Sequence, residues 1–307
     1  MAEQIHFDQI TIIGAGLIGS SIARAVQRGQ LADRLVLADE SIEVCTEAQR
    51  LKLADACMTD AASAVEGADL VVLAVPVGAM ASVGAAIAPS LKAGAIVTDV
   101  GSVKESVFKS LSPLLPAHAH LIPGHPVAGT ERSGPAAGFA SLFDSRWCIL
   151  TPPDDVDAAA LERLSAFWTA LGSKVEIMTA PHHDLVLAIT SHVPHLIAYN
   201  IVGTASDLET VTRSEVIKYS AGGFRDFTRI AASDPTMWRD VFLNNKDAVL
   251  EMLGRFSEDL TALQRAIRWG DGDQLFDLFT RTRDIRRRII DAGQDEAEPD
   301  FGRTHKG

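Results

Sequence analysis

The sequence predicts a chain of two domains: a mostly parallel, doubly wound α/β domain comes first and an all-α domain follows it. Short apolar runs alternate with helical patterns from Gln9 to about Ile177, and the runs ITII and LVVLAV suit strands that helices cover on both faces. After Thr179 the strand signal ends, and the pattern is helical to about Ala292. At 307 residues the chain is long enough for each domain to have a core of its own.

The pattern also predicts the extent of each part. We assign residues 1–178 to the α/β domain, 179–293 to the helical domain and 294–307 to a polar, disordered tail. The expected strands lie near residues 9–13, 35–38, 69–74, 95–99, 119–122, 146–150 and 174–177.

Composition and charge argue against several classes of protein. The net charge of −12 and the pI near 5.2 argue against a nucleic-acid partner, which needs a basic face. The three cysteines are widely spaced and form no CxxC pair, which predicts free thiols in a reducing compartment. His192 and His195 have a spacing that suits a metal, but no carboxylate completes the set, so we predict no metal. The N-terminus has no signal-peptide pattern, and a cytoplasmic location is expected.

One uncharged stretch, between Asp69 and Lys92, is long enough to span a bilayer. It contains Pro76 and Pro89 and is rich in Ala and Gly. We interpret it as a buried strand, LVVLAV, followed by a loop and an Ala-rich helix, and we expect no association with a membrane.

The strongest local signal is a glycine-rich turn in ITIIGAGLIGSSIARAV. Gly14, Gly16 and Gly19 form the pattern G-x-G-x-x-G directly after a strand and at the start of a helix, as in the dinucleotide-binding Rossmann fold. The first glycine permits a tight turn, the second lets the backbone approach a pyrophosphate, and the third lets helix and strand pack closely. Leu17 and Ile18 lie inside the motif, at a helix N-terminus whose N–H groups face the phosphates.

An acidic residue at the end of the second strand indicates which dinucleotide binds. Asp39, 20 residues after Gly19, can accept hydrogen bonds from the adenosine ribose and would repel a 2′-phosphate. Glu40 adds negative charge, so we predict NAD rather than NADP. A glycine-rich turn without a ligand and a methyl-donor nucleotide site are the alternatives. Val75 and Pro76 end a strand at the edge where dinucleotides lie, although a proline is also an ordinary strand terminator.

Polar residues gather in segments that are expected to border a substrate pocket. DVGSVK, residues 99–104, follows a strand and opens a helix, which puts Ser102 near the nicotinamide end of the cofactor. IPGHPVAGTERSG, residues 122–134, places His125, Thr130 and Glu131 in one loop. In the helical half, TSHVPHLIAYN and SAGGFRDFTRIAASDPTMWRD concentrate His, Arg, Asp and Trp.

These motifs resemble those of the prephenate/arogenate (cyclohexadienyl) dehydrogenase family of tyrosine biosynthesis, from Ile10 to about Ile290. GHPVAGTE and GGFRDFTRIAASDPTMWRD are far more specific to that family than the glycine motif. The resemblance implies NAD-dependent oxidative decarboxylation of a cyclohexadiene, in which hydride leaves C4, the C4 hydroxyl loses its proton and CO₂ leaves C1. The product is 4-hydroxyphenylpyruvate from prephenate, or tyrosine from arogenate.

The resemblance also implies roles for individual residues. His125 is similar to a histidine that accepts the hydroxyl proton, a contribution worth about 10²–10⁴ in rate. Ser102 resembles a serine that hydrogen-bonds the same hydroxyl and orients the histidine. Arg229 resembles an arginine that grips a substrate carboxylate, and His195 resembles a second histidine near the substrate. Residues similar to those that line or close the pocket are Thr130, Glu131, Arg225, Asp226 and Trp238.

Structural roles remain open for several of these residues. By itself, a histidine after Pro-Gly, such as His125, is more often a loop residue than a base. Arg229 and Asp226 could form a helical i, i+3 ion pair worth about 0.2–0.5 kcal/mol. Trp238 has the helical spacing of a core residue. The family resemblance favours function for His125 and Arg229 and leaves Trp238, Asp226 and Arg225 balanced.

A single apolar stripe runs along a long helix expected at residues 244–269. The stripe either faces the core of its own chain or joins two copies, and the pattern alone does not separate these cases. We predict a homodimer through the helical half. The members of the stripe are Val249, Leu253, Phe256, Leu260, Leu263 and Ile267.

Two other functions compete with the one that the resemblance implies. A hydroxy acid or hydroxyacyl dehydrogenase has the same two-domain plan, but it usually carries a lysine or a His–Glu pair on the helical domain. A regulator that senses NAD without turnover has no use for Ser102, His125 and Arg229 together. The sequence shows no regulatory domain, so tyrosine is expected to inhibit competitively at the active site. The sequence does not separate prephenate from arogenate, which differ in one keto or amino group.

Overall fold

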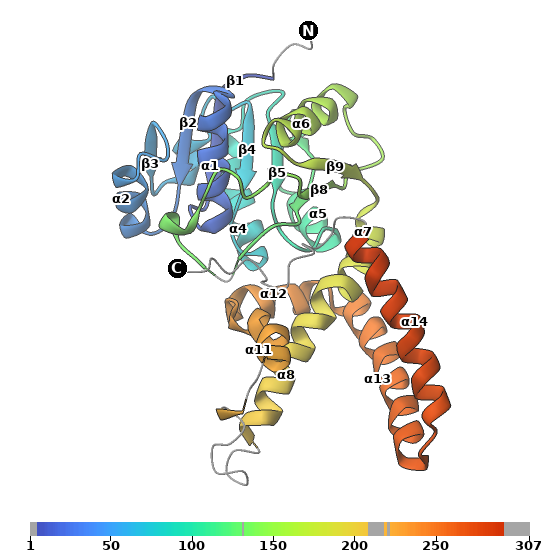
Figure 1. The fold of residues 1–307 in the computed structure, drawn as a ribbon. Coiled ribbons are helices and arrows are strands. Elements are labelled where there is room, and N and C mark those ends of the chain that lie inside the picture. The colour runs from blue at the N-terminus through green and yellow to red at the C-terminus, as the bar shows by residue number, and fades with distance from the viewer. Residues whose placement is uncertain (1–4, 131, 208–217, 220–221, 292–307) are drawn as a thin grey trace. The chain divides into compact units, whose positions relative to one another are not determined.

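A computed structural model describes residues 5–130, 132–207, 218–219 and 222–291 of the chain. In these residues a six-stranded parallel sheet has the order β3-β2-β1-β4-β5-β6, and a second sheet has the order β7-β8-β9 (Figure 1). The strands are β1 (Phe7–Ile13), β2 (Ala32–Ala38), β3 (Ala56–Met58), β4 (Leu70–Leu73), β5 (Ile96–Asp99), β6 (His120–Leu121), β7 (Gly124–Pro126), β8 (Trp147–Leu150) and β9 (Lys174–Ile177).

Helices alternate with the strands as far as β9, and after Thr179 the described chain is helical. The helices before that point are α1 (Leu17–Gly29), α2 (Ile42–Arg50), α3 (Ala61–Ala64), α4 (Met80–Ile87), α5 (Glu105–Leu111) and α6 (Ala158–Ala170). The later helices are α7 (Ala180–Leu187), α8 (Val193–Asp207), α11 (Gly222–Thr228), α12 (Pro235–Asn244), α13 (Lys246–Trp269) and α14 (Gly272–Asp291).

The large sheet is buried because its strands are apolar on both faces. Ile10 and Ile12 of β1 belong to one core with Ile22 of α1, whereas Ile13 belongs to a second core with Met80 of α4. Successive residues of a strand face opposite sides of the sheet, so the single run ITII contributes to both cores. This arrangement confirms the predicted doubly wound α/β domain followed by helices.

The small sheet corrects one part of the prediction. His125 lies in β7, which runs antiparallel to β8, so the expected loop position for this residue is wrong. Strand propensities do not predict β7, because Gly124 and Pro126 flank the histidine and both residue types are rare inside strands. The three-residue strand β3 is also absent from the predicted set, because it is too short to give a periodic signal.

The order of the large sheet positions a ligand site. The order reverses between β1 and β4, and dinucleotides bind at the carboxyl ends of strands beside such a point. Ile13, the last residue of β1, lies in register with Leu73 of β4, which lies in register with Asp99 of β5. The segments that follow these three strands therefore meet at one edge.

The helical part begins with a distorted helix. A π-helical segment, Ala188–His192, joins α7 to α8. Pro194, just after it, has no N–H for the next helical hydrogen bond, which accounts for the irregularity. The chain divides into two compact units, residues 1–250 and 251–307, so α7, α8, α11 and α12 belong to the same unit as the sheets. The tail predicted at 294–307 lies outside the described residues.

Length and composition alone would let one described stretch, Ala180–Asp207, cross a membrane. Its Asp184 is buried and accepts hydrogen bonds from the backbone N–H groups of Lys104 and Glu105, as in a helix packed against a sheet domain. The uncharged stretch after Asp69 forms β4 and α4, as interpreted from the sequence.

Candidate active site

In the glycine-rich turn between β1 and α1, a side chain would clash at two of the glycines and would meet open space at the third. Gly14 has a φ of +98°, and a Cβ there would lie 2.3 Å from the carbonyl oxygen of Ala74. A Cβ on Gly19 would lie 1.9 Å from the carbonyl oxygen of Gly14, so strand and helix approach too closely for a side chain. At Gly16, no described atom lies within 4 Å of the position of a Cβ. This open space beside a helix N-terminus fits a pyrophosphate.

Asp39 is fixed beside this turn, just after the end of β2. Its Oδ2 accepts a hydrogen bond from the backbone N–H of Ala15 at 2.9 Å, and its Oδ1 accepts one from Ser41 at 3.1 Å. Each carboxylate oxygen has a second lone pair, so Asp39 can also accept hydrogen bonds from two ribose hydroxyls. The residues present therefore fit NAD.

The other residues predicted to contact the cofactor lie near the same sheet edge. Leu17 and Ile18 begin α1 and are half-buried. Val75 is half-buried and Pro76 is exposed. Both follow β4, which ends at Leu73, so the strand stops earlier than its apolar run predicts.

A buried ion pair connects two functional segments. Asp99 and Lys104 are both fully buried and form an ion pair. Asp99 accepts hydrogen bonds from the backbone N–H groups of Gly101 at 2.7 Å and Gly124 at 3.2 Å, and Lys104 donates to the carbonyl oxygen of Gly124 at 2.7 Å. Burial raises the pKa of Asp99 and lowers the pKa of Lys104. The pair thus holds the loop of the half-buried Ser102 against strand β7.

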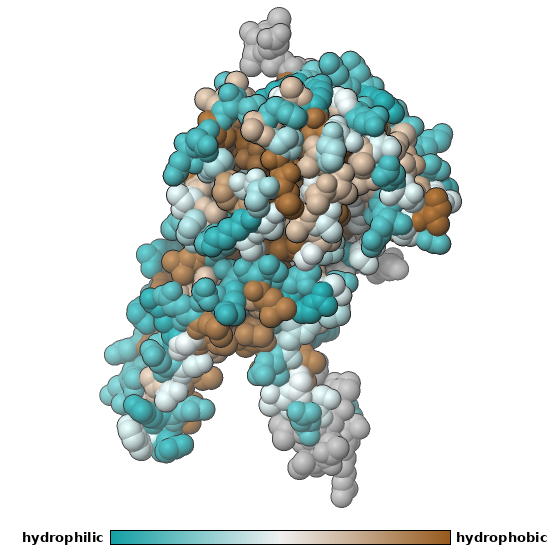
Figure 2. Space-filling model, turned by 180° about the vertical axis from the view of Figure 1, so that it is seen from behind, coloured by the Kyte–Doolittle hydropathy of each residue, from teal (hydrophilic) through white to brown (hydrophobic). Residues whose placement is uncertain are grey.

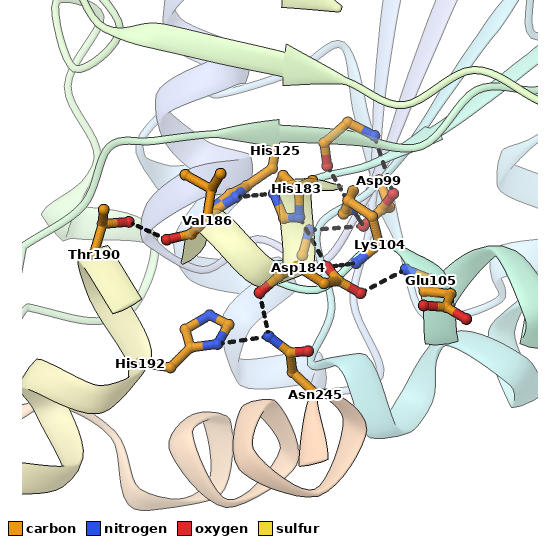
Figure 3. Close-up of polar contacts among 12 residues, drawn as sticks. Asp99, Lys104, Glu105, His125, His183, Asp184, Val186, Thr190, His192 and Asn245 are labelled. Atoms are coloured by element: carbon orange, nitrogen blue, oxygen red, sulfur yellow. Dashed lines mark hydrogen bonds and ion pairs between the residues drawn. The ribbon is translucent and has the colours of Figure 1, made fainter. Parts of the chain in front are cut away.

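His125 is the first member of a chain of buried side chains (Figure 3). Its Nδ1 lies 2.8 Å from Nε2 of His183, whose Nδ1 lies 2.8 Å from Oδ1 of Asp184. Asp184 also accepts hydrogen bonds from the backbone N–H groups of Lys104 at 2.8 Å and Glu105 at 3.0 Å. Burial lowers the pKa of His125 well below its ordinary value, and the nearby His183 and Lys104 lower it further. A neutral ring of this kind can accept a proton.

A second group of rings surrounds Trp238. His195 stacks on this indole with ring centroids 3.7 Å apart, and Nδ1 of His195 lies 2.8 Å from the carbonyl oxygen of Ser191. His192 is fully buried, and the side-chain amide of Asn245 donates a hydrogen bond to its Nδ1 at 3.0 Å. Trp238 is itself buried, so it is both a core residue and the platform under a predicted substrate histidine.

His192 connects the two groups. Burial lowers its pKa to about 4, although the nearby carboxylate of Asp184 and the backbone of Ser102 oppose the shift. The side chain of Asn245 also donates to the backbone carbonyl of Asp184 at 2.8 Å. The rings beside Trp238 and the chain that starts at His125 are therefore linked through His192 and Asn245.

The next residues predicted to bind substrate are in and just after helix α11, and the two arginines among them are exposed. Arg229 is exposed in the 3₁₀ turn after α11. Burial is the main cause of the lowered pKa of His195, and the charge of Arg229 adds to the shift. Nε of Arg225 lies 3.6 Å from Oδ1 of Asp226, so one ion pair of Asp226 is with its direct neighbour.

Two of the predicted substrate residues lie in the segment after β7. Thr130 is exposed, and its hydroxyl accepts a hydrogen bond from the backbone N–H of Arg132 at 3.2 Å. Glu131 lies outside the described residues.

Several residues of the site are missing from the sequence prediction. They are Asp99, Lys104, His183, Asp184 and Asn245. The first two stand in the segment DVGSVK, where an acid that ends an apolar strand and a lysine five residues later were a usable signal of a buried pair. The others have no local pattern that would reveal them, because each also has a partner 53 to 80 residues away in the sequence.

Oxidation of an alcohol by a dinucleotide requires a cofactor site and a group that can take up the hydroxyl proton. Both lie at the carboxyl edge of the large sheet. The chain is thus a dinucleotide-dependent oxidoreductase, and the carboxylate of Asp39 favours NAD.

Comparison with known proteins narrows this class. The family described as prephenate dehydrogenase, nucleotide-binding domain, matches residues 22–177, and its partner, the dimerization domain, matches residues 179–281. Cyclohexadienyl dehydrogenase of Zymomonas mobilis is 46% identical over 91% of this chain and 95% of its own length. Prephenate dehydrogenase of Bacillus subtilis is 34% identical over 91% of this chain and 75% of its own length. The chain belongs to the prephenate dehydrogenase family.

Solved structures agree with this assignment. Prephenate dehydrogenase from Aquifex aeolicus, in complex with hydroxyphenyl propionate and NAD⁺, has a TM-score of 0.87 and 32% identity, with 94% of this chain and 100% of that chain covered. Arogenate dehydrogenase from Synechocystis has a TM-score of 0.76 and 26% identity, with 92% and 99% covered.

Proposed function

We propose that this protein oxidises prephenate, arogenate or both with NAD⁺, with loss of CO₂, in the biosynthesis of tyrosine. The observation that supports this most directly is the buried, neutral His125 beside the loop of Ser102 in a chain of this family. In this proposal residues 1–178 hold the cofactor, and residues 179–293 complete the substrate site. The free cysteines Cys45, Cys57 and Cys148 support a reducing, cytoplasmic location.

The chemistry divides among the residues in a simple way. When bound, NAD⁺ accepts the hydride that leaves C4 of the substrate. His125 accepts the proton of the C4 hydroxyl through Nε2, and Ser102 hydrogen-bonds the same hydroxyl. Arg229 binds a substrate carboxylate in bidentate geometry, with His195 nearby. Residues proposed to line or close the pocket are Trp238, Asp226, Arg225, Thr130 and Glu131.

A steady-state comparison tests this function. We expect NADH and CO₂ to form with prephenate, with arogenate or with both, and NAD⁺ to be strongly preferred to NADP⁺. Turnover of 3-hydroxy acids in place of these substrates would indicate a hydroxy acid dehydrogenase. Binding of NAD⁺ without turnover of any of them would indicate a regulator.

Asp39→Asn is expected to relax the choice of cofactor. The substitution removes the negative charge that opposes a 2′-phosphate and keeps an oxygen for the N–H of Ala15. We expect the ratio of kcat/KM for NAD⁺ to that for NADP⁺ to fall at least about tenfold. Glu40→Gln removes an exposed charge at the next residue and should change the ratio less. A wild-type enzyme that uses both cofactors equally well would contradict the role of Asp39.

We infer that two copies of the chain associate through the helical half. The family match to residues 179–281 is described as a dimerization domain, and part of the apolar stripe on α13 is open. Leu260 and Ile267 are exposed, as are Phe276 and Phe279 on α14. Figure 2 shows hydrophobic residues among hydrophilic ones at the molecular surface. Exposed apolar side chains in such number favour a protein interface.

Leu260→Asp is expected to weaken the dimer at least about tenfold, because one charge per copy would be buried at the interface. Ala262→Asp adds the same charge at an exposed position on the opposite side of α13 and serves as the control. Light scattering across a dilution series measures both dissociation constants. A monomeric wild-type protein at micromolar concentration, or equal effects of the two variants, would refute this interface.

Tyrosine should compete with prephenate, because its ring, hydroxyl and carboxylate match groups of the substrate and product. Arg229→Lys is expected to raise both the KM for prephenate and the inhibition constant of tyrosine about tenfold, since lysine lacks the bidentate fork. Arg255→Lys, at an exposed position of α13, should change neither. Inhibition that persists at saturating prephenate would indicate a separate site.

A further inference from the structure

The proton taken up by His125 has a built path away from the reacting atoms. His125, His183 and Asp184 are all buried and are connected one after the other by two contacts of 2.8 Å (Figure 3). We propose that His183 is the positioning residue of this enzyme: it keeps Nε2 of His125 open for the substrate proton and receives a proton from His125 Nδ1 in the same step. The inference rests on the proposed function, in which His125 is the base.

The first step of the argument is the charge of Asp184. Burial opposes its ionisation, but hydrogen bonds from His183 and from the backbone N–H groups of Lys104 and Glu105 outweigh burial and lower its pKa. An ionised carboxylate can only accept hydrogen bonds. The contact of 2.8 Å with His183 therefore requires the proton of that ring to be on Nδ1.

This proton fixes the tautomers of both histidines. A neutral His183 with a proton on Nδ1 has a lone pair on Nε2, and Nε2 faces Nδ1 of His125 at 2.8 Å. That contact is a hydrogen bond when Nδ1 of His125 carries the proton and donates it. Nε2 of His125 is then a lone pair. It has no hydrogen-bond partner among the described side chains, so it is free to accept from a ligand.

Proton balance follows from the same geometry. The substrate O–H bond breaks and an N–H bond forms at Nε2 of His125, while the proton on Nδ1 of His125 passes to Nε2 of His183. The positive charge then rests on His183, directly beside the Asp184 carboxylate. The overall oxidation releases NADH and CO₂ but no net proton, because the product carries a phenol. The proton therefore returns by the reverse path to the oxygen when the ring becomes aromatic.

The charged groups around His125 and His183 favour a positive charge on His183. Burial lowers the pKa of both rings and Lys104 lowers it further, whereas the carboxylate of Asp184 opposes the shift at His183. His192 disfavours a charge on His125. Asp99 forms an ion pair with Lys104 and favours a charge on His183. Burial raises the pKa of the Cys148 thiol, beside the backbone of His125, so this thiol stays neutral. After the substrate proton is taken up, the positive charge of the pair thus resides on His183.

Steady-state kinetics of His183→Asn test the proposal, with His182→Asn as the matched control. His182 is the preceding residue on the same helix and is exposed. We expect kcat for His183→Asn to fall about tenfold to a hundredfold, with the KM of both substrates within about twofold of wild type. The acid limb of the kcat profile should move to lower pH, because the ring beside the carboxylate is gone. His182→Asn should leave kcat and the profile unchanged.

Imidazole ¹⁵N spectra of the histidine-labelled protein give a readout that does not depend on turnover. In the wild type, we expect neutral His125 to be the tautomer with its proton on Nδ1 and none on Nε2. In His183→Asn, we expect both tautomers of His125 to be populated. The wild-type spectrum also serves as the test if that variant does not fold. A wild-type His125 protonated on Nε2, or a His183→Asn variant with lower kcat but unchanged pH profile and tautomer, would overturn the proposal. Failure to oxidise either prephenate or arogenate, with the expected tautomers intact, would instead refute the proposed function.

Discussion

Replacing His125 with asparagine is expected to lower kcat for oxidation of prephenate about a hundredfold or more, while the affinity for NAD⁺ stays near that of the wild type. The amide of asparagine is not basic enough to take up the hydroxyl proton, so the C4 oxygen must carry more charge in the transition state. The glycine-rich turn and Asp39 make no contact through this side chain, which is why cofactor binding should persist. Rapid mixing and NAD⁺ titration measure the two quantities separately.

The pH profile provides a second check on His125. A histidine acts as a base only in its neutral form, so kcat falls as pH decreases through the pKa of the group. Burial lowers the pKa of His125 well below its ordinary value of 6.5, and we therefore expect full activity to persist below neutral pH. The sequence alone contains no information about this burial. The acid limb should be absent from His125→Asn, and a variant with near-normal kcat would remove this residue from the mechanism.

The cofactor half of the site was predictable because its determinants are contiguous. The glycine motif specifies a turn, and the positive φ of Gly14 and the close approach at Gly19 are the conformations that only glycine allows at these points. Asp39 was equally predictable, since a fixed spacing along one βαβ unit places it beside the turn. The alternation of apolar runs also predicted the parallel sheet, and only the three-residue strands β3 and β7 are missing from the predicted set.

The substrate half was only partly predictable. Family resemblance pointed to Ser102, His125 and His195, but it gave no reason for their basicity or orientation. Those properties arise from contacts between distant segments, such as the one between His125 and His183, 58 residues apart. Hydrophobic periodicity does not record such pairs, because it reports which face of an element is buried and not which polar groups meet across elements.

The buried pair Asp99 and Lys104 leads to the second large effect. Lys104→Met is expected to lower the free energy of unfolding by about 3–5 kcal/mol, because it leaves a carboxylate buried without its partner. Methionine has a similar length and fills the same space, so the loss reports charge rather than volume. The carbonyl oxygen of Gly124 also loses its donor. The backbone N–H that Lys104 gives to Asp184 is unaffected by the substitution.

The direction of the pH dependence separates this cause from simple misfit of the methionine. Burial raises the pKa of Asp99 above its ordinary value of 3.8, and loss of Lys104 should raise it further. The folded variant then binds a proton that the unfolded chain releases, so its stability falls as pH rises between the two pKa values. Urea denaturation should therefore show a smaller deficit relative to wild type at about pH 5 than at about pH 8. Lys109→Met, on the exposed side of the same helix α5, should change stability little at either pH. An equal deficit for Lys104→Met at both pH values would mean that the uncompensated charge of Asp99 is not its cause.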